Sequence, residues 1–479
     1  MSNLSDLLPA GAGGKQVSFV ASGTIGNGVT VGLNADGTVT AVAQVTEGVG
    51  TPVVFESATT FPISATYDST NNKVVIVYKD GGNSGYGTAI IGTVNGTSIS
   101  FGSAVVFESG STNEISATYD SASEKVVIAY SDTAYYGTAI VGTVSGTSIS
   151  FGTSVVFENA VTVHSDATYD SVNQKIIIAY KDNGNSDYGT AIVGTVSGTS
   201  ISFGTAVVYE TAAAANPSIT YDSANEKIVI AYTDEGNFSY GTAIVGTVSG
   251  TSITFGSAIV FESATSNLIS ATYDSVNNKI VIAYQDGGNS SYGTSIVGTV
   301  SGSSISFGSA VVFESGTTTN ISATYDSANG KAVIAYTDNL NSLYGTVIVG
   351  TVTGSSISFG TAVVFESATS QNIFATYDST NKKVVIAYRD SGNSNYGTAI
   401  VFQNAGTNYL DFIGISDAAI SDTASGSVTI KGGISTNVTG LTPNQNYYVQ
   451  ADGTLSTTAS DVLAGKALSS TSINLDYTT

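Results

Sequence analysis

Several residue types that commonly build functional sites are missing or rare. The 479 residues contain no Cys, no Trp, one His (His164) and one Arg (Arg389). A disulfide scaffold, a thiolate zinc site and a cysteine nucleophile are therefore excluded. A Ser-His-Asp triad could use only His164. Its neighbours Ser165 and Asp166 are adjacent in sequence, whereas triad members come from distant segments, so we expect no catalysis there.

Positive charge is also scarce. Lys and Arg total 14 against 36 Asp and Glu, which gives a net charge of −22. This balance argues against a nucleic-acid partner, because neutralising phosphates requires clustered Lys and Arg. No apolar run reaches 18 residues, which argues against membrane insertion. The first residues have no basic segment and too short an apolar stretch for a signal peptide, so we expect assembly in a cytoplasm.

A repeat dominates the rest of the chain. The string Tyr-Asp-Ser recurs every 50 or 52 residues, with its Asp at positions 68, 120, 170, 222, 274, 326 and 378. We number the repeats 1 to 7 by these residues. Each contains four strand-like segments, which in repeat 1 are residues 53–56, 63–68, 73–78 and 87–94. Four short strands per repeat of this length are typical of a β-propeller.

The phase of the repeat indicates how the ring closes. Repeat 7 ends without its own copy of the Val-Val-Phe-Glu segment, and residues 53–56 precede repeat 1 without a partner. Strand 53–56 can therefore close the ring and remove an exposed sheet edge. We predict an all-β fold with a seven-bladed β-propeller over residues 51–402, built from seven repeats of about 52 residues. A solenoid is the alternative, although neither end resembles a capping repeat.

The two ends of the chain lack the repeat but carry strand signals. Residues 1–50 and 403–479 would emerge side by side from a closed propeller. We therefore predict one small split β-domain, sandwich-like or barrel-like, into which the propeller is inserted.

Two stretches resemble surface proteins of tailed-phage virions. They are Gly-Leu-Thr-Pro-Asn-Gln-Asn-Tyr-Tyr-Val-Gln-Ala-Asp-Gly-Thr-Leu at residues 440–455 and the repeat sequence at residues 136–152. The resemblance is to tail-fibre, spike and capsid-decoration proteins of marine and cyanobacterial phages. It implies a structural protein on the virion surface, assembled in the host cytoplasm. The split domain would bind other virion proteins, and a homo-oligomer is expected. The resemblance supplies no catalytic residue.

Two roles follow from this resemblance, and a third stays open beside it. The first is a fibre or spike whose propeller recognises a host-surface receptor or polysaccharide. The second is a capsid decoration or head-fibre protein. The third is a bacterial adhesin or lectin, which the missing signal peptide disfavours.

Two sets of loops on one propeller face differ most between repeats. They leave the Val-Val-Phe-Glu segment and the Lys-Val-Val-Ile-Val-Tyr segment. Because rigid scaffolds carry function on loops, we expect this variable face to bind the ligand. Its candidate residues are Phe61, Lys79, Glu114, His164, Lys181, Phe238, Gln285, Leu343 and Arg389. The alternative is that the sequences of these loops vary because no function constrains them.

Neither a cofactor nor an enzymatic activity is expected. Asp80 and Asn83 offer oxygen ligands of the type that Ca²⁺ prefers, but Asp and Asn also form Asx turns, which we favour. A sialidase-like glycosidase needs an arginine cluster that one Arg cannot form. Hydrolysis by two carboxylates stays open as an alternative, although 21 of the 36 acids recur with the repeat. Glycan binding by Tyr faces and amides is the favoured interpretation.

Overall fold

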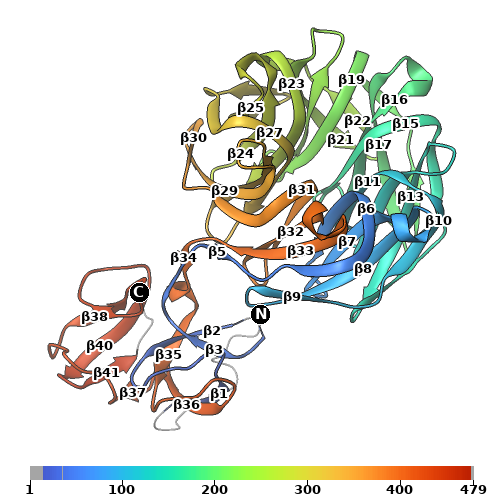
Figure 1. The fold of residues 1–479 in the computed structure, drawn as a ribbon. Coiled ribbons are helices and arrows are strands. Elements are labelled where there is room, and N and C mark those ends of the chain that lie inside the picture. The colour runs from blue at the N-terminus through green and yellow to red at the C-terminus, as the bar shows by residue number, and fades with distance from the viewer. Residues whose placement is uncertain (1–14, 35, 476–479) are drawn as a thin grey trace. The chain divides into compact units, whose positions relative to one another are not determined.

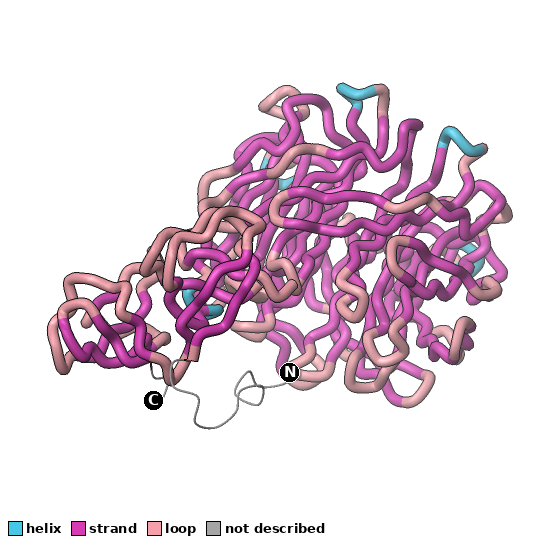
Figure 2. Tube along the Cα trace, turned by 90° about the horizontal axis from the view of Figure 1, so that it is seen from below, coloured by secondary structure: helices cyan, strands magenta, loops and turns pink. Residues whose placement is uncertain are grey.

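The computed structural model describes residues 15–34 and 36–475. Contacts divide the chain into two units, which are described separately. One unit is Gly48–Gln403, and the other combines the two ends, up to Glu47 and from Asn404. Strands dominate both units, and the short helical turns of the propeller unit lie in loops at strand ends (Figure 2). No helix in the described residues is long and apolar enough to cross a membrane.

The propeller unit repeats one antiparallel arrangement of strands around an axis (Figure 1). In repeat 1 the strands are β6 (Val53–Asp68), β7 (Lys73–Asp80), β8 (Tyr86–Asn95) and β9 (Ser98–Phe101). The second half of β6 is the inner strand, which pairs with β7, and β7 pairs with β8. The outer edge of β8 pairs with both β9 and β10, the first strand of repeat 2.

The other repeats have equivalent strands. The long strands are β15 (Val155–Asp170), β19 (Val207–Asp222), β23 (Ile259–Asp274), β27 (Val311–Asp326) and β31 (Val363–Asp378), divided in repeat 2 into β10 (Val105–Ser111) and β11 (Asn113–Asp120). The second strands are β12 (Lys125–Ser131), β16 (Lys175–Asp182), β20 (Lys227–Asp234), β24 (Lys279–Asp286), β28 (Lys331–Asp338) and β32 (Lys383–Asp390). The third strands are β13 (Tyr136–Ser145), β17 (Tyr188–Ser197), β21 (Tyr240–Ser249), β25 (Tyr292–Ser301), β29 (Tyr344–Thr353) and β33 (Tyr396–Gln403). The short outer strands are β14 (Ser148–Phe151), β18 (Ser200–Phe203), β22 (Ser252–Phe255), β26 (Ser304–Phe307) and β30 (Ser356–Phe359).

One expectation about these strands was wrong. The segment Val-Val-Phe-Glu and the inner strand were expected to be joined by a loop, but in six repeats they form one 16-residue strand. Each long strand crosses between repeats, because its first half pairs with the preceding repeat and its second half with its own. This crossing gives the backbone N–H and C=O groups of both halves partners in a sheet.

The first and last repeats are joined by strand pairing. The third strand of repeat 7, β33, pairs with the start of β6, with Ala399 opposite Val53. It also pairs with β5 (Gly48–Val49). Near the C-terminal end of β6, the Tyr67 hydroxyl donates a hydrogen bond to Thr380 Oγ1 of repeat 7 at 2.5 Å. The same tyrosine position links repeats 1 and 2, where Tyr119 donates to Thr70.

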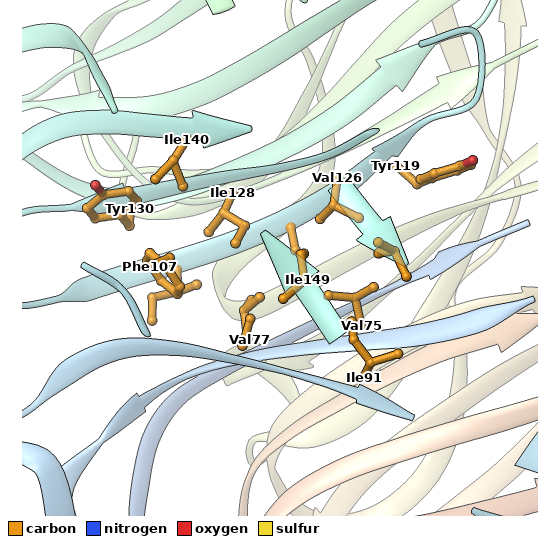
Figure 3. Packing of buried hydrophobic residues seen from close by; sticks show 14 residues of the cluster. Val75, Val77, Ile91, Phe107, Tyr119, Val126, Ile128, Tyr130, Ile140 and Ile149 are labelled. Atoms are coloured by element: carbon orange, nitrogen blue, oxygen red, sulfur yellow. The ribbon is translucent and has the colours of Figure 1, made fainter. Parts of the chain in front are cut away.

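The hydrophobic cores lie between neighbouring repeats. Between repeats 1 and 2, Val75 and Val77 pack against Ile128, with Phe107 and Tyr130 at one end of the cluster (Figure 3). The Phe107 and Tyr130 ring centroids are 5.2 Å apart. Burying a side chain of this size contributes roughly 1.5–3 kcal/mol before entropy is subtracted. Each repeat thus buries its apolar faces only against its neighbours in the ring.

In the part of the terminal unit that the structure describes, there are two five-stranded sheets. The first has the order β1 (Gln16–Val20), β36 (Ser425–Ile430), β35 (Phe412–Ser416), β2 (Thr30–Leu33) and β3 (Val39–Ala41). The second has the order β37 (Ile434–Ser435), β41 (Ser472–Leu475), β40 (Leu463–Ser469), β38 (Asn446–Val449) and β39 (Leu455–Ser456). β4 (Gln44–Val45) pairs with β34 (Gly406–Thr407), followed by the short helical turn η6 (Tyr409–Asp411). One apolar cluster contains Phe412 and Ile415 of the first sheet with Val449 and Leu475 of the second, so the two sheets share a core.

Candidate functional site

One residue bulges out of the long strand of each repeat where the inner half begins. In repeat 3 the register shifts between the pairs Val163–Lys181 and Asp166–Ala179. The bulged residue has φ between 48° and 52° in repeats 2 to 7, a region that L-residues other than Asn and Asp seldom occupy. We call these six residues the bulge ring: Glu114, His164, Asn216, Leu268, Asn320 and Asn372.

The bulge ring is held by contacts between neighbouring repeats. The Glu114 carboxylate accepts a hydrogen bond from the His164 backbone N–H at 2.9 Å. Asn320 Oδ1 accepts in the same way from the Asn372 N–H, also at 2.9 Å. The structure therefore brings together Glu114 and His164, two residues that the sequence predicted for the variable face.

A cavity of about 370 Å³ lies on the propeller axis inside the bulge ring. Five bulge residues line it, all except Glu114, together with the inner-strand residues that follow them. The deeper layer is a ring of hydroxyls, each accepting a hydrogen bond from an N–H of the next repeat. An example is Ser218, whose Oγ accepts from the Ala271 N–H at 3.0 Å. The serines that accept in this way are Ser64, Ser116, Ser218, Ser270 and Ser322.

Two repeats depart from serine in this layer, and both departures line the cavity. Repeat 3 has Asp166, whose carboxylate accepts from the Ile219 N–H at 3.0 Å and from the Ser116 hydroxyl at 2.8 Å. Burial raises the pKa of the Asp166 carboxyl, and these hydrogen bonds oppose the rise. Repeat 7 has Phe374, which packs on the core shared with repeat 1. The cavity wall therefore carries a carboxylate in repeat 3 and an aromatic ring in repeat 7.

The adjacent residues His164, Ser165 and Asp166 do not form a triad. The Ser165 hydroxyl donates to the Glu114 carbonyl oxygen at 2.8 Å. Asp166 is occupied by Ser116 and by backbone N–H groups, so no relay runs from it to His164 and Ser165. In the described residues, no three His, Cys, Asp or Glu side chains are grouped to hold a metal ion.

The residue that follows the repeated Tyr of the second strand contacts the next repeat. We call it the junction position. It alternates between long polar side chains and short hydroxyls, in the order Lys79, Ser131, Lys181, Thr233, Gln285, Thr337 and Arg389. The Ser131 hydroxyl donates to the Thr162 carbonyl at 2.8 Å, whereas Lys79 Nζ donates to Asn113 Oδ1 at 3.0 Å. The predicted ligand residues Lys79, Lys181 and Gln285 are therefore engaged within the protein.

The loops after the second strands alternate with the same two-repeat period. Repeats 1, 3, 5 and 7 have short helical turns, η2 (Gly81–Asn83), η3 (Asn183–Asn185), η4 (Gly287–Asn289) and η5 (Ser391–Asn393). Repeats 4 and 6 instead expose apolar residues, among them Phe238 and Leu343, which are 81% and 38% exposed. In η2 the Asp80 carboxylate accepts from the N–H groups of Gly82 and Asn83. This is the Asx-turn geometry that we favoured over a calcium site for Asp80 and Asn83.

The axial cavity and the two-repeat period were not predicted from the sequence. A signal for each was present. Asp166 and Phe374 interrupt a position that is otherwise Ser, and the junction residues alternate in size along the chain. Which repeated position faces the axis follows only from the curvature of the ring.

Comparisons with known proteins identify the fold. No protein-family model and no curated protein matches the sequence. Among solved structures, the BP39L lectin from Burkholderia pseudomallei is similar with a TM-score of 0.56 at 8% identity, covering 77% of this chain and 100% of that chain. A chain of the mitotic checkpoint complex is similar with a TM-score of 0.50 at 7% identity, covering 74% and 92%. Identities this low show the fold alone, and the predicted all-β propeller fold is confirmed.

Proposed function

We propose that this protein binds carbohydrate and that the axial cavity holds the end of a glycan chain. The observation that carries the proposal is the composition of the cavity wall. Asp166, His164 and Asn216 supply hydrogen-bonding groups, while Phe374 and Leu268 supply apolar surface. A sugar presents hydroxyl groups at its edge and C–H groups on its face, so it needs both kinds of surface. The volume of about 370 Å³ falls within the usual range of small-molecule sites.

Binding without hydrolysis is the form of this function that we favour. Glycoside hydrolysis needs two carboxyl groups on opposite sides of the scissile bond. Asp166 is the single carboxylate among the described residues that line the cavity. The similarity in fold to a protein described as a lectin agrees with this choice.

The biological setting that we propose is the surface of a tailed-phage virion. The propeller would recognise a host-surface polysaccharide as part of a fibre or spike, and the terminal unit would bind other virion proteins. The resemblance of residues 136–152 and 440–455 to virion surface proteins supports this setting. A capsid decoration or head-fibre role is the second candidate, and a bacterial adhesin or lectin is the third.

The binding site can be tested by returning single positions to the repeat consensus. Asp166→Ser and Phe374→Ser restore the residue found at this position in the other five repeats, so both variants should fold. After a glycan array identifies the best oligosaccharide, titration calorimetry should show at least tenfold weaker binding by each variant. The matched control is Phe238→Ser at an exposed loop tip, which should bind like the wild type. Loss of binding only in the control would move the site from the axis to the loops, and an array without any binder would contradict the function.

A further inference from the structure

Six of the seven junction positions hydrogen-bond to the next repeat. Lys79, Lys181 and Gln285 do so with long side chains, at 3.0, 2.7 and 2.7 Å. The short hydroxyls donate to carbonyl oxygens at 2.6–2.8 Å in the same direction around the ring, from Ser131, Thr233 and Thr337. Because seven is odd, the alternation cannot continue across the seam between repeats 7 and 1, where two repeats of the long-chain type meet.

Arg389 occupies the junction position at this seam and makes no such bond within residues 15–34 and 36–475. The Arg389 side chain instead contacts the Phe61 ring, whose centroid lies 5.9 Å from the guanidinium carbon. The Arg389 Nε atom is buried and has no hydrogen-bond partner among the residues that the structure describes. Phe61 stands where Asn113 stands at the junction of repeats 1 and 2, so the polar partner of Lys79 is replaced here by an aromatic ring.

The seam also lacks the acids that neutralise a cation at an equivalent junction. Lys181 lies 2.7 Å from the Glu235 carboxylate and 3.9 Å from that of Asp187. The positions equivalent to Glu235 and Asp187 at the seam are Gly81 and Asn395. In a chain with a net charge of −22, the one guanidinium is therefore placed where these counter-charges are absent.

We propose that Arg389 and Phe61 form a second binding site, which takes the carboxylate of an acidic saccharide. A guanidinium presents N–H donors in a planar fork that matches a carboxylate, and it stays protonated at any physiological pH. The two Nη groups would bind the carboxylate, since Nε is covered. Phe61 is 54% exposed, so its free surface can contact the C–H groups of the sugar ring. This inference rests on the proposed function in taking a saccharide as the ligand.

The probes for this site are a matched pair of sugars. Titration calorimetry would compare methyl glucuronoside with methyl glucoside, which lacks the carboxylate, and with acetate, which lacks the sugar. The wild type should bind the glucuronoside at least tenfold more tightly than either other probe. In Arg389→Gln the two glycosides should bind equally. Gln is the residue of repeat 5, where Gln285 donates to the Thr318 carbonyl, so this variant should fold with an unchanged melting temperature.

The possible failures are distinguishable. Equal binding of both glycosides by the wild type would overturn the Arg389 site and leave the proposed function intact. Binding of acetate as tight as that of the glucuronoside would show a simple anion site and overturn the saccharide inference. A wild type that binds neither glycoside would also overturn the Arg389 site, whereas the proposed function is contradicted only by a glycan array without any binder. Arg389→Lys supplies a further check, because it keeps the charge without the fork and should lose most of the preference.

Discussion

Backbone conformation at single residues shapes the mouth of the axial cavity. Asn occupies three of the six bulge positions, as expected for φ near 50°, but Glu114, His164 and Leu268 adopt the same conformation. This backbone conformation destabilises an L-residue by roughly 1–2 kcal/mol, and it destabilises Asn by less. Such conformations cluster at binding sites, which fits the place of these residues beside the cavity. The sequence could not predict the bulge, because neither Glu nor Leu is typical of this backbone region.

Exchanging residues between two bulge positions isolates this conformational cost. Glu114 and Asn320 both accept a hydrogen bond from the N–H of the next bulge residue. Glu114→Asn should keep that acceptor, relieve the backbone and raise the free energy of unfolding by about 0.5–1 kcal/mol. The reverse change, Asn320→Glu, should lower it by a similar amount. Chemical denaturation of the two variants measures both, and a loss of stability in Glu114→Asn would show that the Glu side chain stabilises more than its backbone costs.

At the scale of strands, a buried tyrosine of the second strand and a glutamate in the first half of the crossing strand connect these two strands within each repeat. The Tyr78 hydroxyl donates to Glu56 at 3.1 Å, and the same pair occurs in every repeat. Burial raises the pKa of the Glu56 carboxyl, the negative charge of Asp80 adds to the rise, and the Tyr78 hydrogen bond opposes it. The pKa is raised, with burial as the largest cause, in four further members, Glu158, Glu262, Glu314 and Glu366.

These raised pKa values predict how stability depends on pH. A carboxyl whose pKa is higher in the folded state than its usual 4.5 binds more protons when folded. Its contribution to stability is therefore complete below 4.5 and is lost as pH rises through the folded pKa. We expect a higher melting temperature near pH 5 than near pH 8.

The control for this pH dependence is Glu366→Gln. The amide oxygen can still accept the hydrogen bond from Tyr388 but does not ionise. This variant should lose less stability between the two pH values than the wild type. A melting temperature that rises from pH 5 to pH 8 would contradict the account.

The strands were predicted from sequence to different degrees. The β-branched second strand and the third strand of each repeat stand out by composition and by flanking turn residues. The short outer strand, Ser98–Phe101 in repeat 1, was missed because its four residues carry little signal alone. It is ordered by pairing with the far half of β8. The continuity of the long strands was missed because no Gly or Pro marks the bulge in five of the seven repeats, and the Pro residues of the other two, Pro62 and Pro217, are typical of loops.

At the scale of the whole molecule, the repeat length and number made the propeller fold predictable, whereas the axial cavity was not. Repeats 2 to 7 each contribute only three or four residues to the cavity lining, and these residues meet only when the ring closes. The candidate site residues also separate in space. Glu114 and His164 lie near the propeller axis. Four candidates lie at the junctions between repeats: Lys79, Lys181, Gln285 and Arg389. Phe238 and Leu343 lie at loop tips. These residues were selected because they vary between repeats, and variability alone does not distinguish the axis, the junctions and the loop tips.

The proposed place on a virion can be checked by microscopy. Gold-labelled antibody against this chain should mark fibres or the tail tip of purified phage particles, because a receptor-binding propeller must reach the host surface. Label over the head would support the capsid decoration role instead. Particles without label would contradict a virion protein and favour the adhesin.

Carbohydrate binding at the propeller axis is tested most directly by a crystal structure of the protein with its best-binding oligosaccharide. We predict electron density for a terminal sugar inside the bulge ring, with its hydroxyl groups toward Asp166 and His164 and its apolar face toward Phe374. An empty axial cavity in crystals that hold the saccharide elsewhere on the propeller would contradict this account.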